Sequence, residues 1–389
     1  MNRRLFCFSL LFSPLVNAKE KTIPDCLKVD TTANNISYKI NKITGFKKHH
    51  IHSYFDLNPD SPDCSSLLCF RFLGRVPGIG SIIVYRDFDP NKATVVAEGV
   101  HGTAHEAALQ QWLSDEAIAY VDFSKKNVTT EIISTDAKRL MSISGGLRSA
   151  NIRTMLGLFS SHELRRPNRK PSREFVQVVD LNSGMEKFNI VIDDLLKIDE
   201  LNEILVSAAG YQVKHPKWSV DGNHFFFVLY KKSEVVNGPK KVLIMSDKNG
   251  VNINYIGEFL HHPVWDHTGR NIYYFGGRKK DQILYRYNIV QRRAVPVIPG
   301  ILGDHLNVHV SGRFFIVDKV TRSKSRDGQI VLINDAGKVL YRHSYEGDNI
   351  SYKERLHPHP IWSRDGCSVF ANVIEKGIRG VVKIDLSTT

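Results

Sequence analysis

The chain has 389 residues, with 53 lysines and arginines against 40 aspartates and glutamates, and a formal net charge of +13. The basic residues are scattered along the sequence, which favours a polyanionic partner by long-range attraction. No stretch after the N-terminal segment approaches the roughly 18 consecutive apolar residues of a membrane-spanning helix, so we expect no membrane span.

The first 18 residues have the three parts of an export signal. Arg3 and Arg4 form a basic start, Leu5–Leu15 an apolar core, and Val16-Asn17-Ala18 a small-residue cleavage site. The apolar core is too short to remain as an anchor. We therefore expect residues 1–18 to be a signal peptide and residues 19–389 to form one soluble domain, periplasmic or secreted.

An exported protein meets acidic polysaccharides and lipopolysaccharide, not nucleic acid. The positive charge therefore favours an acidic glycan as partner. Four cysteines follow the signal, namely Cys26, Cys64, Cys69 and Cys367. In an oxidising compartment they permit two disulfides, in any of three pairings.

A repeat centred on tryptophan runs through the mature chain. Each tryptophan stands three or four residues before a turn Asp or Gly and is followed by an apolar run; the four are Trp112, Trp218, Trp265 and Trp362. Asp-Gly supplies the positive φ angles that a tight hairpin turn needs. A copy without tryptophan at Val308–Val317 and a degenerate copy at Asn58–Phe70 extend the pattern.

One complete unit reads as four short antiparallel strands, Pro216–Val220, His224–Tyr230, Lys241–Ser246 and Asn252–Glu258. This pattern, repeated many times, is typical of propeller blades. Trp112 and Trp218 are two units apart, and units of that length fit about seven times into the mature chain. The sequence thus predicts an all-β, seven-bladed β-propeller, which we expect to be a monomer.

The last unit offers only three strands, Pro360–Trp362, Ser368–Val373 and Val381–Asp385. An unpaired edge there would invite aggregation. We expect the N-terminal segment Ile36–Ile43 to supply the fourth strand and close the ring.

Histidines recur at one position of the repeat. Seven residues before the turn glycine of four units stand His215, His262, His305 and His359. Each lies where the innermost strand of its blade begins, so all four should point toward one end of the central channel. His357 precedes His359 by two residues and shares its face. Neutral imidazoles gathered in this way suit a divalent transition metal, although His-Pro packing against the next blade's tryptophan is the alternative.

These motifs resemble known families. The Trp-Ser-x-Asp-Gly units resemble TolB-type propeller repeats. The run His357-Pro-His359-Pro-Ile-Trp-Ser-Arg-Asp-Gly366, with His305 and His262 in earlier blades and His52-Ser-Tyr-Phe-Asp56, resembles oligogalacturonate lyase. Ala104-His105 followed by Gln110-Gln111-Trp112 is similar to the propeller-fold ulvan lyases.

The resemblance to oligogalacturonate lyase implies a divalent cation, manganese first and zinc or calcium second, held by His305, His357 and His359. Glu354 stands where we read a glutamine in that family. For the family's essential arginine, Arg148 and Lys217 are the candidates. The resemblance to ulvan lyases would instead make His105 the base or a carboxylate partner.

The candidate site has three sets of residues. For catalysis we take His105, His262, Tyr211 and Lys217; for substrate binding His52, Arg148 and His215; for the metal His305, His357, His359 and Glu354. A cation on a uronate carboxylate would stabilise the charge that develops when the C5 proton leaves, and a neutral histidine or tyrosine would move that proton.

We therefore predict a lyase that cleaves uronate-containing glycans by β-elimination. The alternative is a non-catalytic TolB-like propeller that binds an envelope partner or an anionic glycan through the same channel mouth. Hydrolysis is less favoured, because no paired carboxylates at glycosidase positions stand out.

Overall fold

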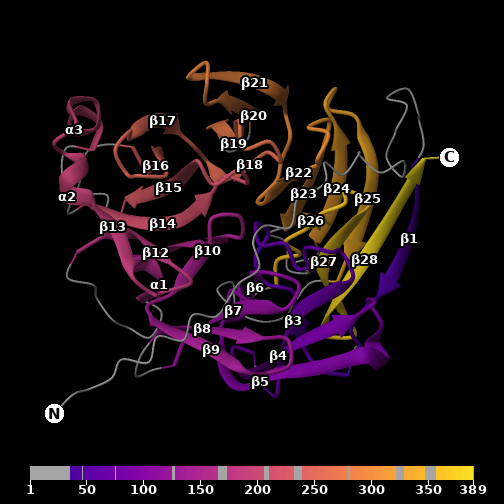
Figure 1. Cartoon of the computed structure of the whole chain (residues 1–389). Helices are drawn as coiled ribbons and strands as arrows, with labels where there is room; N and C mark the ends of the chain where they lie inside the picture. Colours follow the sequence, from indigo (N-terminus) through magenta and orange to yellow (C-terminus); the bar gives the residue numbers. More distant parts are fainter. Residues whose placement is uncertain are drawn as a thin grey trace, which may run out of the picture.

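The computed structural model describes residues 36–388 except 46, 75, 125–127, 165–172, 206–209, 232–238, 279–280, 321–327 and 347–355. Glu354 lies outside these residues. The described strands form seven four-stranded sheets arranged around a central axis (Figure 1). The prediction of a seven-bladed β-propeller is confirmed.

Each sheet is an antiparallel meander whose first strand is nearest the axis. Blades 1 to 3 are β2 (His50–Ile51), β3 (Ser66–Phe72), β4 (Gly78–Arg86) and β5 (Ala93–Gly102); β6 (Gln111–Trp112), β7 (Ala117–Asp122), β8 (Thr129–Ser134) and β9 (Arg139–Ser144); and β10 (Leu147–Asn151), β11 (Leu156–Ser160), β12 (Phe175–Asp180) and β13 (Glu186–Val191). Blades 4 to 6 are β14 (Tyr211–Trp218), β15 (His224–Lys231), β16 (Lys241–Asp247) and β17 (Asn254–Glu258); β18 (His261–Trp265), β19 (Asn271–Arg278), β20 (Asp281–Asn288) and β21 (Arg293–Pro299); and β22 (Leu306–Val308), β23 (Phe314–Val320), β24 (Gly328–Asn334) and β25 (Val339–Tyr345).

The seventh blade joins the two ends of the chain. Its strands are β26 (Ile361–Trp362), β27 (Ser368–Glu375), β28 (Ile378–Thr388) and, outermost, β1 (Ile36–Lys42). β1 pairs antiparallel with β28, with Ile40 opposite Ile384, and the two strands run side by side in Figure 1. The N-terminal strand therefore closes the ring, as the missing fourth strand predicts.

The tryptophans occupy equivalent places at the ends of β6, β14, β18 and β26. The indole Nε1 of Trp112 donates to the carbonyl oxygen of Pro59 (2.8 Å), and that of Trp265 to the carbonyl oxygen of Lys217 (3.1 Å). Each of these two indoles thus ties its blade to the preceding one. The turn glycines that follow have φ near +70°, as for Gly222 and Gly366, which explains why glycine recurs there.

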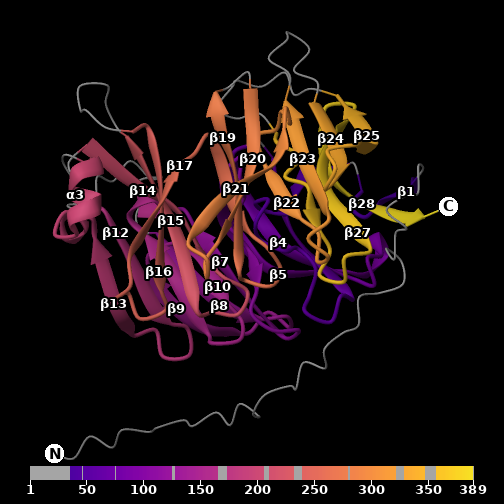
Figure 2. The same cartoon turned by 90° about the horizontal axis from the view of Figure 1, so that it is seen from above.

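The helices among the described residues are few and short. The 3₁₀ turn η2 (Pro90–Lys92) and α1 (Ser161–Leu164) are single turns, while α2 (Ile192–Leu195) and α3 (Asp199–Leu205) follow blade 3 at the outer edge, where both views place α3 (Figure 2). Among the described residues no helix has the length and apolar character needed to cross a membrane.

The expectation of two disulfides is wrong. Cys367 is disulfide-bonded, but Cys69 is a free thiol in the middle of β3, fully buried in the core between blades 1 and 7. Burial raises the pKa of this thiol well above its usual value, so it acts as a small apolar core residue. With Cys69 unpaired, the four cysteines can make at most one disulfide.

The ring closure predicts a specific cost. Ile43, 3% exposed, follows β1 and packs with residues of blades 1 and 7. Ile43→Ala should lower the free energy of unfolding by about 2–5 kcal/mol, because it removes buried methyl groups at the seam. Urea unfolding measures this, with Val251→Ala at a 74% exposed position as control. Equal stability of the two variants would mean that packing of Ile43 between blades 1 and 7 does not stabilise the ring.

Candidate functional site

Four histidines from successive blades form an arc at one end of the channel. Neighbouring ring centroids lie 4.9 Å apart for His215 and His262, 4.8 Å for His262 and His305, and 4.6 Å for His305 and His359. All four stand on or just before the innermost strand of a blade, and their common position in the repeat brings their rings together. We call this set, together with His105 and His357, the histidine arc.

The backbone at two of these histidines is strained. His215 has φ of +48° and His359 of +46°, the left-handed region that side chains other than glycine rarely adopt. Each is followed by a proline, Pro216 and Pro360 respectively. Such conformations cost on the order of 1–3 kcal/mol and concentrate at functional sites. They turn the two imidazoles into the channel.

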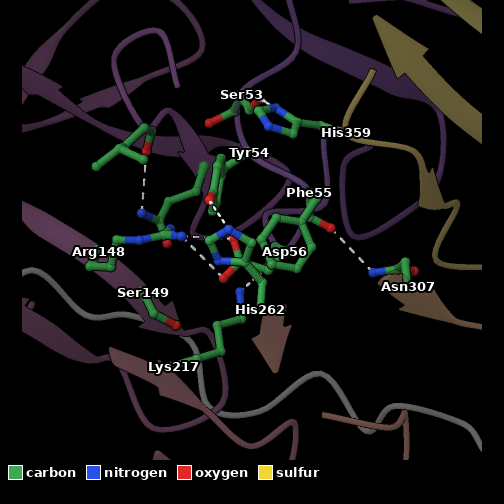
Figure 3. Close-up of polar contacts among 12 residues, drawn as sticks. Ser53, Tyr54, Phe55, Asp56, Arg148, Ser149, Lys217, His262, Asn307 and His359 are labelled. Atoms are coloured by element: carbon green, nitrogen blue, oxygen red, sulfur yellow. Dashed lines mark hydrogen bonds and ion pairs between the residues drawn. The ribbon is translucent and has the colours of Figure 1, made fainter. Parts of the chain in front are cut away.

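Tyr54 fills the middle of the arc. Its ring centroid lies within 6 Å of five histidine rings, at 5.5 Å from His105, 5.7 Å from His215, 5.9 Å from His262, 5.6 Å from His305 and 4.7 Å from His359. The ring is 1% exposed, and its hydroxyl lies 3.5 Å from Nε2 of His262 (Figure 3). Tyr54 therefore sets the spacing of the imidazoles. The motif His52-Ser-Tyr-Phe-Asp56 contained this residue, but the repeat assigned it no role.

Three histidines fit a metal ion. One nitrogen each of His105, His305 and His359 lie within 4.8 Å of one another. Nδ1 of His305 donates to the carboxylate of Asp318 at 3.0–3.1 Å, and Nδ1 of His359 donates to the carbonyl oxygen of Ser53 at 3.3 Å. In both rings Nε2 is then the atom with a lone pair, and it is buried without a hydrogen-bond partner.

The surroundings of His305 strengthen this fit. Asp318 is fully buried and also accepts the backbone N–H of His305 at 2.9 Å, which fixes the imidazole orientation and tautomer. A carboxylate behind a histidine is the usual second layer of a metal site. Donors that are all imidazoles favour a divalent transition metal over calcium.

The structure also brings His357 into the arc. Its ring centroid lies 5.0 Å from that of His305 and 4.7 Å from that of His105, and it stacks on His359 at 5.7 Å. His305, His357 and His359, the set expected to hold a metal, are thus neighbours. Their ligand atoms fall into two overlapping groups, however: one joins His305 and His359 to His105, and the other joins His305 and His357 to Asp318.

Burial keeps three histidines of the arc neutral. Removal from water, followed by the positive charge of neighbouring histidines, lowers the pKa of His215, His262 and His359 well below the usual 6.5. The buried ring of His52, beside His359, has its pKa lowered by burial to about 4. Neutral imidazoles at pH 7 are the form that binds metals and accepts protons.

Arg148 and Lys217, the candidates for an essential cation, both meet Asp56. Nη2 of Arg148 donates to both carboxylate oxygens of Asp56 at 3.1 and 3.2 Å, and its guanidinium lies 4.6 Å over the Tyr54 ring (Figure 3). Lys217 donates to the backbone carbonyl oxygen of Asp56, and burial lowers the pKa of its ammonium to about 8. Arg148 therefore supports the arc through Tyr54.

Lys217 faces the other end of the channel. It lines a cavity of about 330 Å³ together with Trp112, Trp218, Trp265 and Trp362, and none of the arc histidines lines that cavity. A catalytic role for Lys217 at the arc is therefore not supported by its position.

Tyr211 does not belong to the site. It is fully buried at the start of β14 and packs with Leu195 and Leu201 of α2 and α3, and its hydroxyl donates to the carbonyl oxygen of Pro239 at 3.0 Å. These contacts hold its hydroxyl on the backbone of Pro239, so the structure gives no support to the prediction that Tyr211 moves a proton beside the histidines.

No protein-family model and no curated protein matches the chain, but solved structures do. Oligogalacturonate lyase from Vibrio parahaemolyticus aligns with 90% of this chain and 97% of its own at a TM-score of 0.66 and 14% identity. An oligogalacturonate lyase in complex with manganese aligns with 90% of this chain and 96% of its own at 0.64 and 15%. The chain has the oligogalacturonate lyase fold.

A similar propeller also forms part of a larger enzyme. Prolyl oligopeptidase B from Galerina marginata aligns with 88% of this chain but 47% of its own, at a TM-score of 0.54 and 12% identity. At such identities likeness shows the fold alone. The function must therefore be inferred from the residues of the arc.

The second layer of the site can be tested without any substrate. Asp318→Asn should weaken Mn²⁺ binding by about 10–100-fold, because the amide no longer holds His305 through a negative charge. Isothermal titration calorimetry measures this, with Asp335→Asn on the exposed side of the same blade as control. Unchanged affinity in Asp318→Asn would mean that His305 is not a ligand.

Neutral buried histidines also make stability depend on pH. Burial lowers the pKa of His52 and of His309 to about 4, whereas both titrate near 6.5 when unfolded. Between pH 6.5 and 4 the unfolded chain binds more protons, so the free energy of unfolding should fall as the pH falls through this window. Urea unfolding with EDTA present measures the slope, which should be shallower in His309→Gln. A flat profile in the wild type would contradict these pKa shifts.

Proposed function

We propose that this protein is a metal-assisted lyase that cleaves uronate-containing oligosaccharides or polysaccharides by β-elimination. The observation that carries the proposal is the histidine arc, in which two buried Nε2 atoms without hydrogen-bond partners face a third histidine. The fold supports it, since one oligogalacturonate lyase of this fold is described in complex with manganese. Export by residues 1–18 would bring the enzyme to acidic glycans in the periplasm or outside the cell.

The reaction requires loss of a weakly acidic proton. The C5 proton of a uronate is weakly acidic, because the adjacent carboxylate is already negative. Stabilising the negative charge that develops when this proton leaves lowers the barrier. A divalent cation bound by His105, His305 and His359 would supply a Lewis acid for that carboxylate. The donor set favours manganese or zinc over calcium.

In this proposal His262 accepts the C5 proton. It is neutral at pH 7, partly exposed, and adjacent to His305 in the arc. The electron pair of the C5–H bond forms the C4–C5 double bond while the C4–O bond breaks, and the leaving oxygen takes a proton from water or a neighbouring donor. The hydroxyl of Tyr54, 3.5 Å from Nε2 of His262, fixes the orientation of this base.

Positive charge behind the arc assists an anionic substrate. The guanidinium of Arg148 is fully buried, and its charge reaches His215 as well as Tyr54. In a site with little water such a charge acts over a longer range than at the surface. Arg148 and the partly exposed His215 would thereby favour binding of a carboxylate.

A non-catalytic role is supported by one observation. His305 and His359 are only 2% and 0% exposed, and a closed metal site of this kind is typical of structural ions. In that case the arc would stabilise a propeller that binds an envelope partner or an anionic glycan.

Substitution of arc histidines separates these functions. His359→Ala and His305→Ala should each reduce formation of unsaturated uronate by at least about a hundredfold, because each removes a proposed ligand of the cation, while an intact thermal unfolding transition remains. Ultraviolet absorbance of the product over polygalacturonate, ulvan, glycosaminoglycans and alginate, with manganese, zinc or calcium, measures the rate. His343→Ala on β25 is the control.

Two results would change the assignment. Loss of turnover in His105→Ala with metal still bound would make His105 the base, as in an ulvan-lyase-like arrangement. Wild-type protein that yields no unsaturated product from any of these glycans would favour the binding propeller.

A further inference from the structure

Two lysines converge on one aromatic ring next to the arc. Nζ of Lys214 lies 4.8 Å from the ring centroid of Tyr230, and Nζ of Lys241 lies 5.0 Å from the same centroid. The three residues come from adjacent strands of blade 4: Lys214 from β14, Tyr230 from β15, and Lys241 directly opposite Tyr230 on β16. We call these three residues the lysine–tyrosine group.

The ring of Tyr230 attracts both ammonium groups. The negative face of an aromatic ring attracts a cation. Phe259 extends the aromatic surface, with its ring centroid 6.0 Å from that of Tyr230 and 5.7 Å from Nζ of Lys241. Lys241 also donates to the carbonyl oxygen of Leu260, which fixes its ammonium.

The lysine–tyrosine group borders the histidine arc. The rings of Tyr230 and His215 lie 6.1 Å apart, and Leu260, which anchors Lys241, is two residues before His262. Burial is the main cause of the low pKa of His215 and of His262, and a neighbouring histidine is the next. The charge of Lys214 lowers the pKa of His215 further, and that of Lys241 the pKa of His262. Lys214, Tyr230 and Lys241 are all partly exposed, so they form a rim beside the arc.

We propose that the lysine–tyrosine group is a second anion-binding subsite, which holds the carboxylate of a neighbouring sugar residue of an acidic oligosaccharide. This deepens the proposed function and rests on it for the ligand class. A chain of uronates carries one carboxylate per residue, so a ligand with one carboxylate at the arc presents the next within reach of the rim. Ammonium groups beside an aromatic ring offer a charged donor for a carboxylate and an apolar surface for the sugar ring that carries it.

The test compares ligand lengths. Trigalacturonate, galacturonate and neutral maltotriose are titrated calorimetrically, in low-salt buffer with manganese, into the protein with its native lysines (the wild type in this comparison) and into Lys214→Gln, Lys241→Gln and the double variant. All of these proteins carry His262→Gln, which suppresses turnover but leaves the cation in place. Each single substitution should weaken trigalacturonate binding by about three- to tenfold, and the double more, with a smaller effect on galacturonate. Rising salt should weaken wild-type binding more steeply than that of the double variant.

Two controls secure the interpretation. Lys248→Gln changes an exposed lysine in the turn at the opposite end of the same blade and should leave affinity unchanged. Lys241→Arg keeps the cation and should retain most of the affinity. Matching thermal unfolding transitions show that the variants fold.

The outcomes distinguish this subsite from the lyase proposal. Weaker trimer binding in the variants supports the subsite even if the wild type forms no unsaturated product. Product formation with equal trimer affinity in the wild type and the double variant overturns the subsite and leaves the lyase intact. Absence of wild-type binding to trigalacturonate, or equal loss for galacturonate and the trimer, also overturns it.

Discussion

The organising constraint is that every blade of a closed propeller starts its innermost strand at the same end of the channel. A residue repeated at that start must therefore meet its copies around the axis, and here the copies of one histidine lie ring to ring. Closure by β1 against β28 keeps this geometry, because an open ring would let the first and last blades separate. The arc thus depends on pairing between segments more than 300 residues apart.

Desolvation then gives the arc its chemistry. Tyr54 and the surrounding strands exclude water, so His215, His262 and His359 stay neutral although several imidazoles are gathered in a small volume. Asp318 behind His305 and the Ser53 carbonyl oxygen behind His359 select the tautomers that leave Nε2 facing inward.

The repeat made the fold and the position of His215, His262, His305 and His359 predictable, because a fixed spacing in a propeller means a fixed place. It could not reach residues outside the repeat. Tyr54 enters the channel from the irregular inner edge of blade 1. Asp318 lies on β23, and its place behind His305 follows only from the pairing of β23 with β22. The contact that holds the Tyr211 hydroxyl on the backbone of Pro239 cannot be read from spacing either. Cys69 was misjudged because a buried strand position looks the same as a disulfide position in sequence.

Direct observation of a metal in the arc tests the central claim most sharply. Crystals of the full chain grown with manganese should show an anomalous peak at roughly 2.0–2.2 Å from Nε2 of His305 and Nε2 of His359, with His105 or His357 completing the ligands. No anomalous peak among the arc histidines at saturating manganese or zinc would contradict the account. The arc would then be a packed cluster of neutral rings that holds the blades around Tyr54.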